Sequence, residues 1–209
     1  MDVYTFLRKG ATISLVDTPS FDNDQRSDFE VLRLLASWLT LSYKSDIMLD
    51  GIIYFHDIRI PRTHSLRRDL EIFKRLCGDR AMKNVLLATV GWDEVRSEAF
   101  SGREHSLVTE DGLWGAMVNR GSRVVRHYNN QSSALRLVDM FLDIRTDPTP
   151  LEIQVEFVIE GKLLQDTAAG RSVKGGPLDE TNREAFPDRK GERVKRFTGD
   201  DGFRSKGTN

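Results

Sequence analysis

The chain has 209 residues, of which 39% are hydrophobic and 30% charged, and this is enough to bury one sizeable domain core. Its formal net charge of -1 excludes the basic excess expected of a nucleic-acid-binding protein. The single cysteine, Cys77, excludes an internal disulfide framework, and no apolar run approaches the ~20 residues of a membrane span, so we expect a cytoplasmic protein.

The N-terminal part of the chain predicts a hairpin and then a helix. Two short β-prone runs, residues 3–7 and 11–16, are joined by a turn that contains Gly10. After an intervening loop, Ser27 and Glu30 have the spacing of a capping box, and apolar residues follow at helical spacing. We therefore expect a helix over residues 28–44.

Strand-like and helix-like stretches then alternate along the chain. Short apolar runs predict strands at residues 51–56, 85–89 and around 124–125. Helical patterns occupy residues 66–77, ended by Gly78, then 107–118 and 132–144. This alternation predicts an α/β fold of three layers, in which helices cover both faces of a mostly parallel sheet.

The composition changes near residue 165. Residues 1–165 carry the alternating pattern, whereas residues 166–209 are rich in glycine and charge and have few large apolar residues. Such a segment cannot bury enough apolar surface to offset the entropy of ordering. We expect one domain over 1–165 and a disordered tail over 166–209.

The loop that starts with Asp17, Thr18 and Pro19 is the clearest functional signal from spacing. Ligands of parallel α/β sheets bind at the carboxyl ends of the strands, and Asp17 ends the second predicted strand. A carboxylate there can hold Mg²⁺ beside a bound triphosphate. It can equally cap the turn by accepting a backbone hydrogen bond.

A resemblance supports the first alternative. The run Leu15-Val16-Asp17-Thr18-Pro19 resembles the aspartate-containing switch loop of P-loop GTPases related to septins and immune-associated nucleotide-binding proteins. Collinear matches to a group of fungal G-domain proteins follow between residues 27 and 170. The resemblance implies a Ras-like G domain, with Mg²⁺ and GTP as cofactors and Asp17 as the metal residue.

The resemblance also exposes an absence. Family members carry a Gly-x-x-x-x-Gly-Lys-Ser/Thr phosphate loop after their first strand, and no such motif occurs in the 209 residues. The chain begins at what would be the family's second strand. We therefore expect a G domain that lacks its first strand and its phosphate loop, and that is truncated or degenerate. The missing strand would leave a gap in the middle of the family's sheet.

Further candidate binding residues depart from the family pattern. Ser20 stands where the switch loop has glycine. Thr89 begins the segment that matches the base-recognition loop, in which Trp92 could stack on a base or pack in the core, and Asp93 is one place late. Two more residues, Arg126 and His127, match the last loop beside the base.

Two functions remain open from the sequence. The first is a GTP-binding protein of the P-loop GTPase class, in which no residue acts as a covalent catalyst. The second is a nucleotide-free module with no cofactor that binds a protein partner. The resemblance also implies a possible homodimer.

Overall fold

The computed structural model describes residues 1–21, 26–60, 64–92, 97–144 and 147–173. The described residues 1–20 belong to one compact unit and residues 21–173 to another.

The first unit is a two-stranded antiparallel hairpin of β1 (Asp2–Arg8) and β2 (Ala11–Asp17). Lys9 and Gly10 connect the strands, and both have positive φ, 48° and 79°. Two such residues make the type I′ turn, whose twist matches that of the flanking strands. The predicted hairpin is confirmed, and Asp17 is its last residue.

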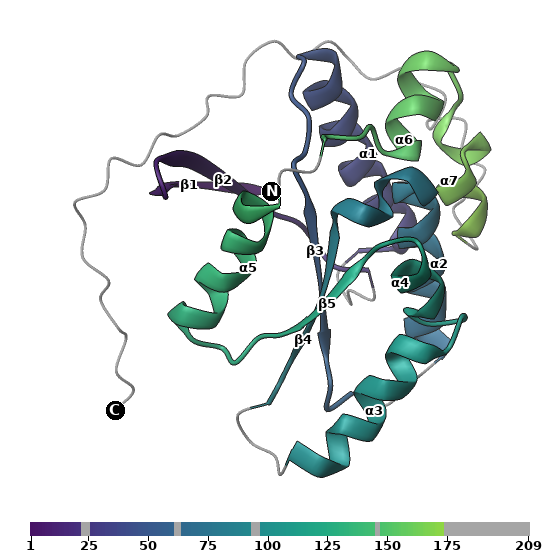
Figure 1. Cartoon of the computed structure of the whole chain (residues 1–209). Coiled ribbons are helices and arrows are strands. Elements are labelled where there is room, and N and C mark those ends of the chain that lie inside the picture. The colour runs from purple at the N-terminus through teal and green to yellow at the C-terminus, as the bar shows by residue number, and fades with distance from the viewer. Residues whose placement is uncertain (22–25, 61–63, 93–96, 145–146, 174–209) are drawn as a thin grey trace, which may run out of the picture. The chain divides into compact units, whose positions relative to one another are not determined.

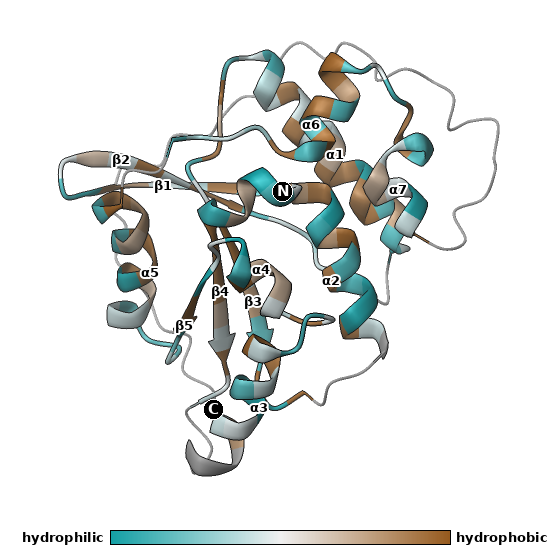
Figure 2. Cartoon of the chain, turned by 45° about the vertical axis from the view of Figure 1, so that its right-hand side comes forward, coloured by the Kyte–Doolittle hydropathy of each residue, from teal (hydrophilic) through white to brown (hydrophobic). Residues whose placement is uncertain are grey.

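The second unit contains a parallel sheet in the order β3-β4-β5. Figure 1 shows the three strands side by side, and Figure 2 shows hydrophobic stretches along them. The strands are β3 (Ile52–Asp57), β4 (Val85–Val90) and β5 (Arg123–Arg126). All three predicted strands are confirmed. β4 lies in the centre, and its first five residues are buried, as expected of a strand covered on both faces.

Helices lie on both sides of this sheet (Figures 1 and 2). One side carries the larger core, to which α1, α2, α3 and α4 contribute, and the other carries a small cluster under α5. The helices are α1 (Asp28–Lys44), α2 (His64–Cys77), α3 (Ser97–Thr109), α4 (Gly115–Asn119) and α5 (Gln131–Asp143), with a 3-10 helix at Asp79–Asn84. The three-layer α/β fold class predicted from the sequence is therefore correct.

Local signals in the sequence explain two of the helix boundaries. The capping box is present, because Ser27 Oγ accepts from Glu30 N while the Glu30 carboxylate accepts from Ser27 N. Gly78, with φ of 74°, ends α2 in the left-handed conformation that favours glycine.

The helical pattern predicted over 107–118 is interrupted in the structure. α3 ends at Thr109, and α4 begins at Gly115. Trp114, which is fully buried, donates its backbone N–H to the carbonyl of Leu107 across the break. A Cβ at Gly115 would lie 2.9 Å from the Glu110 carbonyl, so glycine allows this tight turn.

The ordered domain extends beyond the predicted boundary at residue 165. Short helical segments end with α7 (Ala168–Ser172), which packs against α2. The preceding segments are α6 (Glu152–Gln154), a π-helical turn (Val155–Ile159) and a 3-10 turn (Leu164–Asp166). Thr167 and Ala169 are fully buried, so residues 166–173 belong to the packed domain. The rest of the predicted tail, 174–209, lies outside the described residues.

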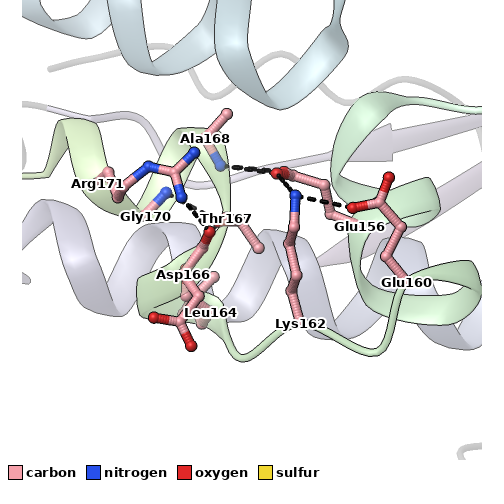
Figure 3. A network of polar contacts seen from close by, with 9 residues as sticks. All are labelled: Glu156, Glu160, Lys162, Leu164, Asp166, Thr167, Ala168, Gly170 and Arg171. Carbon is pink, nitrogen blue, oxygen red and sulfur yellow. Dashed lines mark hydrogen bonds and ion pairs between the residues drawn. The ribbon is translucent and has the colours of Figure 1, made fainter.

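A buried carboxylate holds this C-terminal segment together (Figure 3). Glu156 is 2% exposed and accepts from Lys162 Nζ at 3.0 Å and from the Ala168 backbone N–H at 3.0 Å. Ala168 is the first residue of α7, so the carboxylate satisfies a helix N–H that has no partner within the helix. The charge of Glu156 is thereby paired and hydrogen-bonded, as a buried carboxylate requires.

Candidate functional site

The carboxyl edge of the sheet carries the candidate site. The register pairs Asp57 with Val90 and Thr89 with Arg126, so the three strands end at one edge. Ligands of open parallel α/β sheets bind at such an edge. The sequence placed Thr89, Trp92, Arg126 and His127 there, and the structure brings these four residues together.

Thr89 and Trp92 are joined by direct hydrogen bonds. Thr89 is fully buried, and its hydroxyl donates to Glu104 Oε1 at 3.0 Å. Trp92 is 8% exposed, and its Nε1–H donates to Thr89 Oγ1 at 3.0 Å and to the Thr89 carbonyl at 3.2 Å. The indole is thus anchored through its polar edge, which leaves only its faces for stacking.

Arg126 closes the group. Its Nε donates to Glu104 Oε2 at 2.9 Å and its Nη2 to the same oxygen at 2.5 Å. The hydrogen bond with Glu104 raises the pKa of Arg126 above its ordinary value, so the guanidinium stays charged. The guanidinium carbon lies 4.0 Å from the centre of the Trp92 ring, in cation–π geometry. We call Thr89, Trp92, Glu104 and Arg126 the edge cluster.

The edge cluster presents Arg126 outward. The Arg126 side chain is 34% exposed, whereas that of Glu104 is 14% exposed. The ring of Trp92 is buried and carries the guanidinium on one face. The planar group in the cluster that an incoming aromatic ring can reach is therefore Arg126.

His127 and the residue after it are held by the first turn of α5. The His127 backbone N–H donates to the Thr89 carbonyl at 2.8 Å, and its Nδ1 lies 2.9 Å from Ser133 Oγ. The Tyr128 N–H also donates to Ser133 Oγ, at 3.1 Å. Both backbone amides therefore have their hydrogen-bond partners inside the protein.

The end of β3 contributes an ion pair. Asp57 accepts from the Arg59 guanidinium, with Nη2 at 2.7 Å, and from the Arg59 backbone N–H at 2.9 Å. The side-chain hydrogen bond from Arg59 holds the pKa of Asp57 below its ordinary value. Gly91, with φ of 83°, lies so close that a Cβ would meet the Asp57 carboxylate. The Asp57 carboxylate therefore stabilises the start of the loop between β3 and α2, through its bonds to Arg59.

The predicted switch residues lie in the other unit. Asp17 ends β2, and Thr18, Pro19 and Ser20 follow without regular secondary structure. Asp17, Thr18 and Ser20 are exposed to solvent. In the described part of the chain, no three His, Cys, Asp or Glu side chains come together as metal ligands. A lone carboxylate does not hold Mg²⁺ without phosphate oxygens and water, so these residues alone do not fit the ion.

Two residues of the candidate site, Glu104 and Ser133, were not predicted from the sequence. Glu104 was not predicted, because it lies in a mixed segment whose helix began earlier, at Ser97, than the pattern indicated. Ser133 could have been found, because Asn130 caps α5 by accepting from the Ser133 N–H, a spacing visible in the sequence. The predicted Asp93 lies outside the described residues.

One finding concerns membranes. Among the helices in the described ranges, none combines the length and the apolar character needed to cross a bilayer.

Comparison with known proteins gives a fold. No family model and no curated protein matches the chain in sequence. A solved structure of Toc33 from Arabidopsis thaliana with Mg²⁺ and GMPPNP is similar over 69% of this chain and 71% of its own length, with 16% identity and a TM-score of 0.51. A second structure is similar over 71% of this chain and 69% of its own length. It was reported with the statement that dimerization is important for the GTPase activity of the chloroplast translocon components atToc33 and psToc159. Its identity is 18% and its TM-score 0.53.

Two further Toc33 structures match 62% of this chain at a TM-score of 0.47, and the match spans a little over half, 56%, of their length. With the parallel order β3-β4-β5 and helices on both sides, the two better matches show that this chain has an α/β fold similar to that of the Toc33 structures.

Proposed function

We propose that the chain is a guanine-nucleotide-binding protein of the P-loop GTPase class and that the edge cluster is its nucleobase platform. The observation that carries this proposal is the guanidinium of Arg126, which is fixed on Trp92 and Glu104 at the carboxyl edge of a G-domain-like sheet. A purine stacks well on an arginine plane that is already held flat. Since the guanidinium is ion-paired, stacking does not leave its charge uncompensated.

The choice of guanine rests on the likeness of the fold to a Toc33 structure that holds GMPPNP. A stacking platform accepts any base, because every base has a π face. The reading of the guanine edge belongs to groups near the platform, among which we include the side chain of His127, whereas the buried Thr89 helps to hold the platform. Asp93 is a further candidate from the sequence.

Phosphate binding is a separate matter. The 209 residues contain no Gly-x-x-x-x-Gly-Lys-Ser/Thr motif, so these residues lack the loop that cradles phosphates in this class. Asp17 remains our candidate for a Mg²⁺ ligand, and Thr18, Pro19 and Ser20 for the sensing of a terminal phosphate. Because Asp17 needs phosphate oxygens beside it, we expect this chain to take the base weakly, with a Kd on the order of 1 mM, and we derive no hydrolytic step.

Arg126→Lys tests the platform, because lysine keeps a cation beside Glu104 and removes the planar surface. We expect guanosine binding, followed by ligand-observed NMR, to weaken about tenfold in this variant and in Arg126→Ala. Arg120→Ala is the matched control, since Arg120 forms an ion pair with Asp79 at 2.7 Å and lies outside the edge cluster. It should bind guanosine like the wild type.

The proposal fails if both Arg126 variants, shown to be folded by circular dichroism, bind guanosine as the wild type does. It also fails if the folded wild type binds no guanine compound.

A second candidate is the nucleotide-free module that binds a protein partner. The engaged amides of His127 and Tyr128 favour it, because these groups are not free to read a base. A folded wild-type chain that does not bind guanosine would support the function of a protein-binding module.

A further inference from the structure

β3 lies at an edge of the described sheet but has the composition of an interior strand. It pairs with β4 alone in the order β3-β4-β5. Its sequence, Ile-Ile-Tyr-Phe-His-Asp, contains no lysine, proline or glycine. Edge strands of soluble proteins ordinarily carry such residues, or a bulge, because an unprotected edge pairs with other strands. β3 therefore has the character of a strand that is paired on both sides.

The outer backbone of β3 is available for pairing. The Ile58 N–H donates to the Val90 carbonyl at 3.0 Å, which turns the backbone groups of Ile58 toward β4. Backbone groups alternate in direction along a strand, so those of Ile53 and Phe55 point to the outer edge. Within the described residues of the sheet unit, 21–173, no hydrogen bond reaches their N–H groups at this edge.

One face of β3 leaves an aromatic side chain exposed. Phe55 occupies the middle of β3 and is 52% exposed. Its neighbour Tyr54 points to the opposite face and packs against Phe73, with ring centres 4.8 Å apart. On the side of Phe55, the small cluster under α5 includes Ile53 but leaves the phenyl ring half in water. The Phe55 ring has a tilted contact with His127, with ring centres 6.0 Å apart, and its exposed half is free for an apolar contact.

We propose that β3 pairs antiparallel with β3 of a second copy of this chain, about a two-fold axis at Phe55, so that the two three-stranded sheets become one. This proposal does not depend on nucleotide binding. A two-fold interface joins a surface to itself, and β3 is its own complement around Phe55.

The cross-strand neighbours support a second copy as the occupant. In this register the outward N–H and C=O groups of Phe55 exchange hydrogen bonds with those of the partner's Phe55. The two phenyl rings meet on one face, while Tyr54 lies opposite the partner's His56 on the other, and aromatic pairs of this kind stabilise sheets. Asp57, opposite the partner's Ile53, already has its charge paired with Arg59. A net charge of -1 on each copy gives little repulsion.

Sedimentation equilibrium of the full chain tests the interface. We expect the wild type to form a dimer and Phe55→Lys to weaken dimerization at least about tenfold, because two lysines would meet on the axis. Leu41→Lys is the matched control, since Leu41 on α1 is also exposed, at 46%. It should dimerize like the wild type.

A cross-link tests the register and does not require a destabilising charge. Directly opposite residues have Cβ atoms about 4.5–5.5 Å apart, within the reach of a disulfide, so Phe55→Cys should give a covalent dimer under mild oxidation. Leu41→Cys should not, and the native Cys77 is buried and does not compete. A wild type that stays monomeric at about 0.5 mM would overturn the proposal. The proposal would also be overturned by a dimer whose stability is unchanged in Phe55→Lys and that gives no Phe55→Cys cross-link. Such a dimer would form through a surface other than β3.

Discussion

His56 is a buried histidine whose protonation the fold opposes. It is 7% exposed, and its ring lies edge-on to Trp114, with centres 6.0 Å apart. Burial lowers the pKa of His56, although the nearby Asp57 acts in the opposite direction. The folded protein therefore holds this imidazole neutral over a range of pH in which the unfolded chain has begun to bind a proton.

This difference predicts a loss of stability in mild acid. Below about pH 6.5, the ordinary pKa of histidine, the unfolded state binds more protons than the folded state. The free energy of unfolding therefore decreases as the pH is lowered, until the pH reaches the lowered pKa of His56 in the folded state. Urea unfolding at about pH 7.5 and pH 5.5 measures the fall. His56→Gln should flatten it, and an equal fall in wild type and variant would exclude His56 as its source.

Residues that the sequence could and could not predict differ in where their partners come from. Four of them lie at or just after the carboxyl ends of β4 and β5: Thr89, Trp92, Arg126 and His127. They were found through the resemblance of these loops to the family's base-binding loops. Glu104 comes from a helix and joins the site only because α3 passes Arg126, at a separation of 22 residues. A pairing of this kind depends on tertiary packing, which the spacing of residues does not reveal.

At the scale of elements, the same division applies. α1 was predicted with its bounds, because the capping box and the apolar spacing are both local. The short segments between Glu152 and Ser172 were not, since helices of three to five residues have no stability of their own and depend on packing. Gly170 shows this dependence: a Cβ there would overlap the backbone carbonyl of Leu164, a group that cannot move aside.

Gly170→Ala should therefore lower the free energy of unfolding by about 1–3 kcal/mol, because the overlap forces α7 away from Leu164. Gly102→Ala is the matched control, since Gly102 lies inside α3 with open space around its Cβ position. It should raise stability by about 0.5–1 kcal/mol through helix propensity. Urea denaturation measures the free energy of unfolding of both variants. If Gly170→Ala left it unchanged, the close contact between Gly170 and the Leu164 carbonyl would be excluded.

At the scale of the whole molecule, the fold and the chemistry lead to different expectations. The parallel sheet with helices on both faces is similar to that of the Toc33 structures, and the switch role of the Asp17 loop stays a prediction from the sequence. The phosphate loop, on which the chemistry of this class depends, has no counterpart in the 209 residues. The sequence predicted the class of fold, because strand-like and helix-like stretches alternate along it.

Calorimetric titration of the full chain with GMPPNP and Mg²⁺, beside guanosine and beside the Asp17→Ala variant, tests the central claim most directly. We predict that GMPPNP and guanosine bind with similar affinities, on the order of 1 mM, without dependence on Mg²⁺ or on Asp17, because only the base finds a site. Micromolar binding of GMPPNP that needs Mg²⁺ and is lost in Asp17→Ala would contradict this account, since another segment would then grip the phosphates.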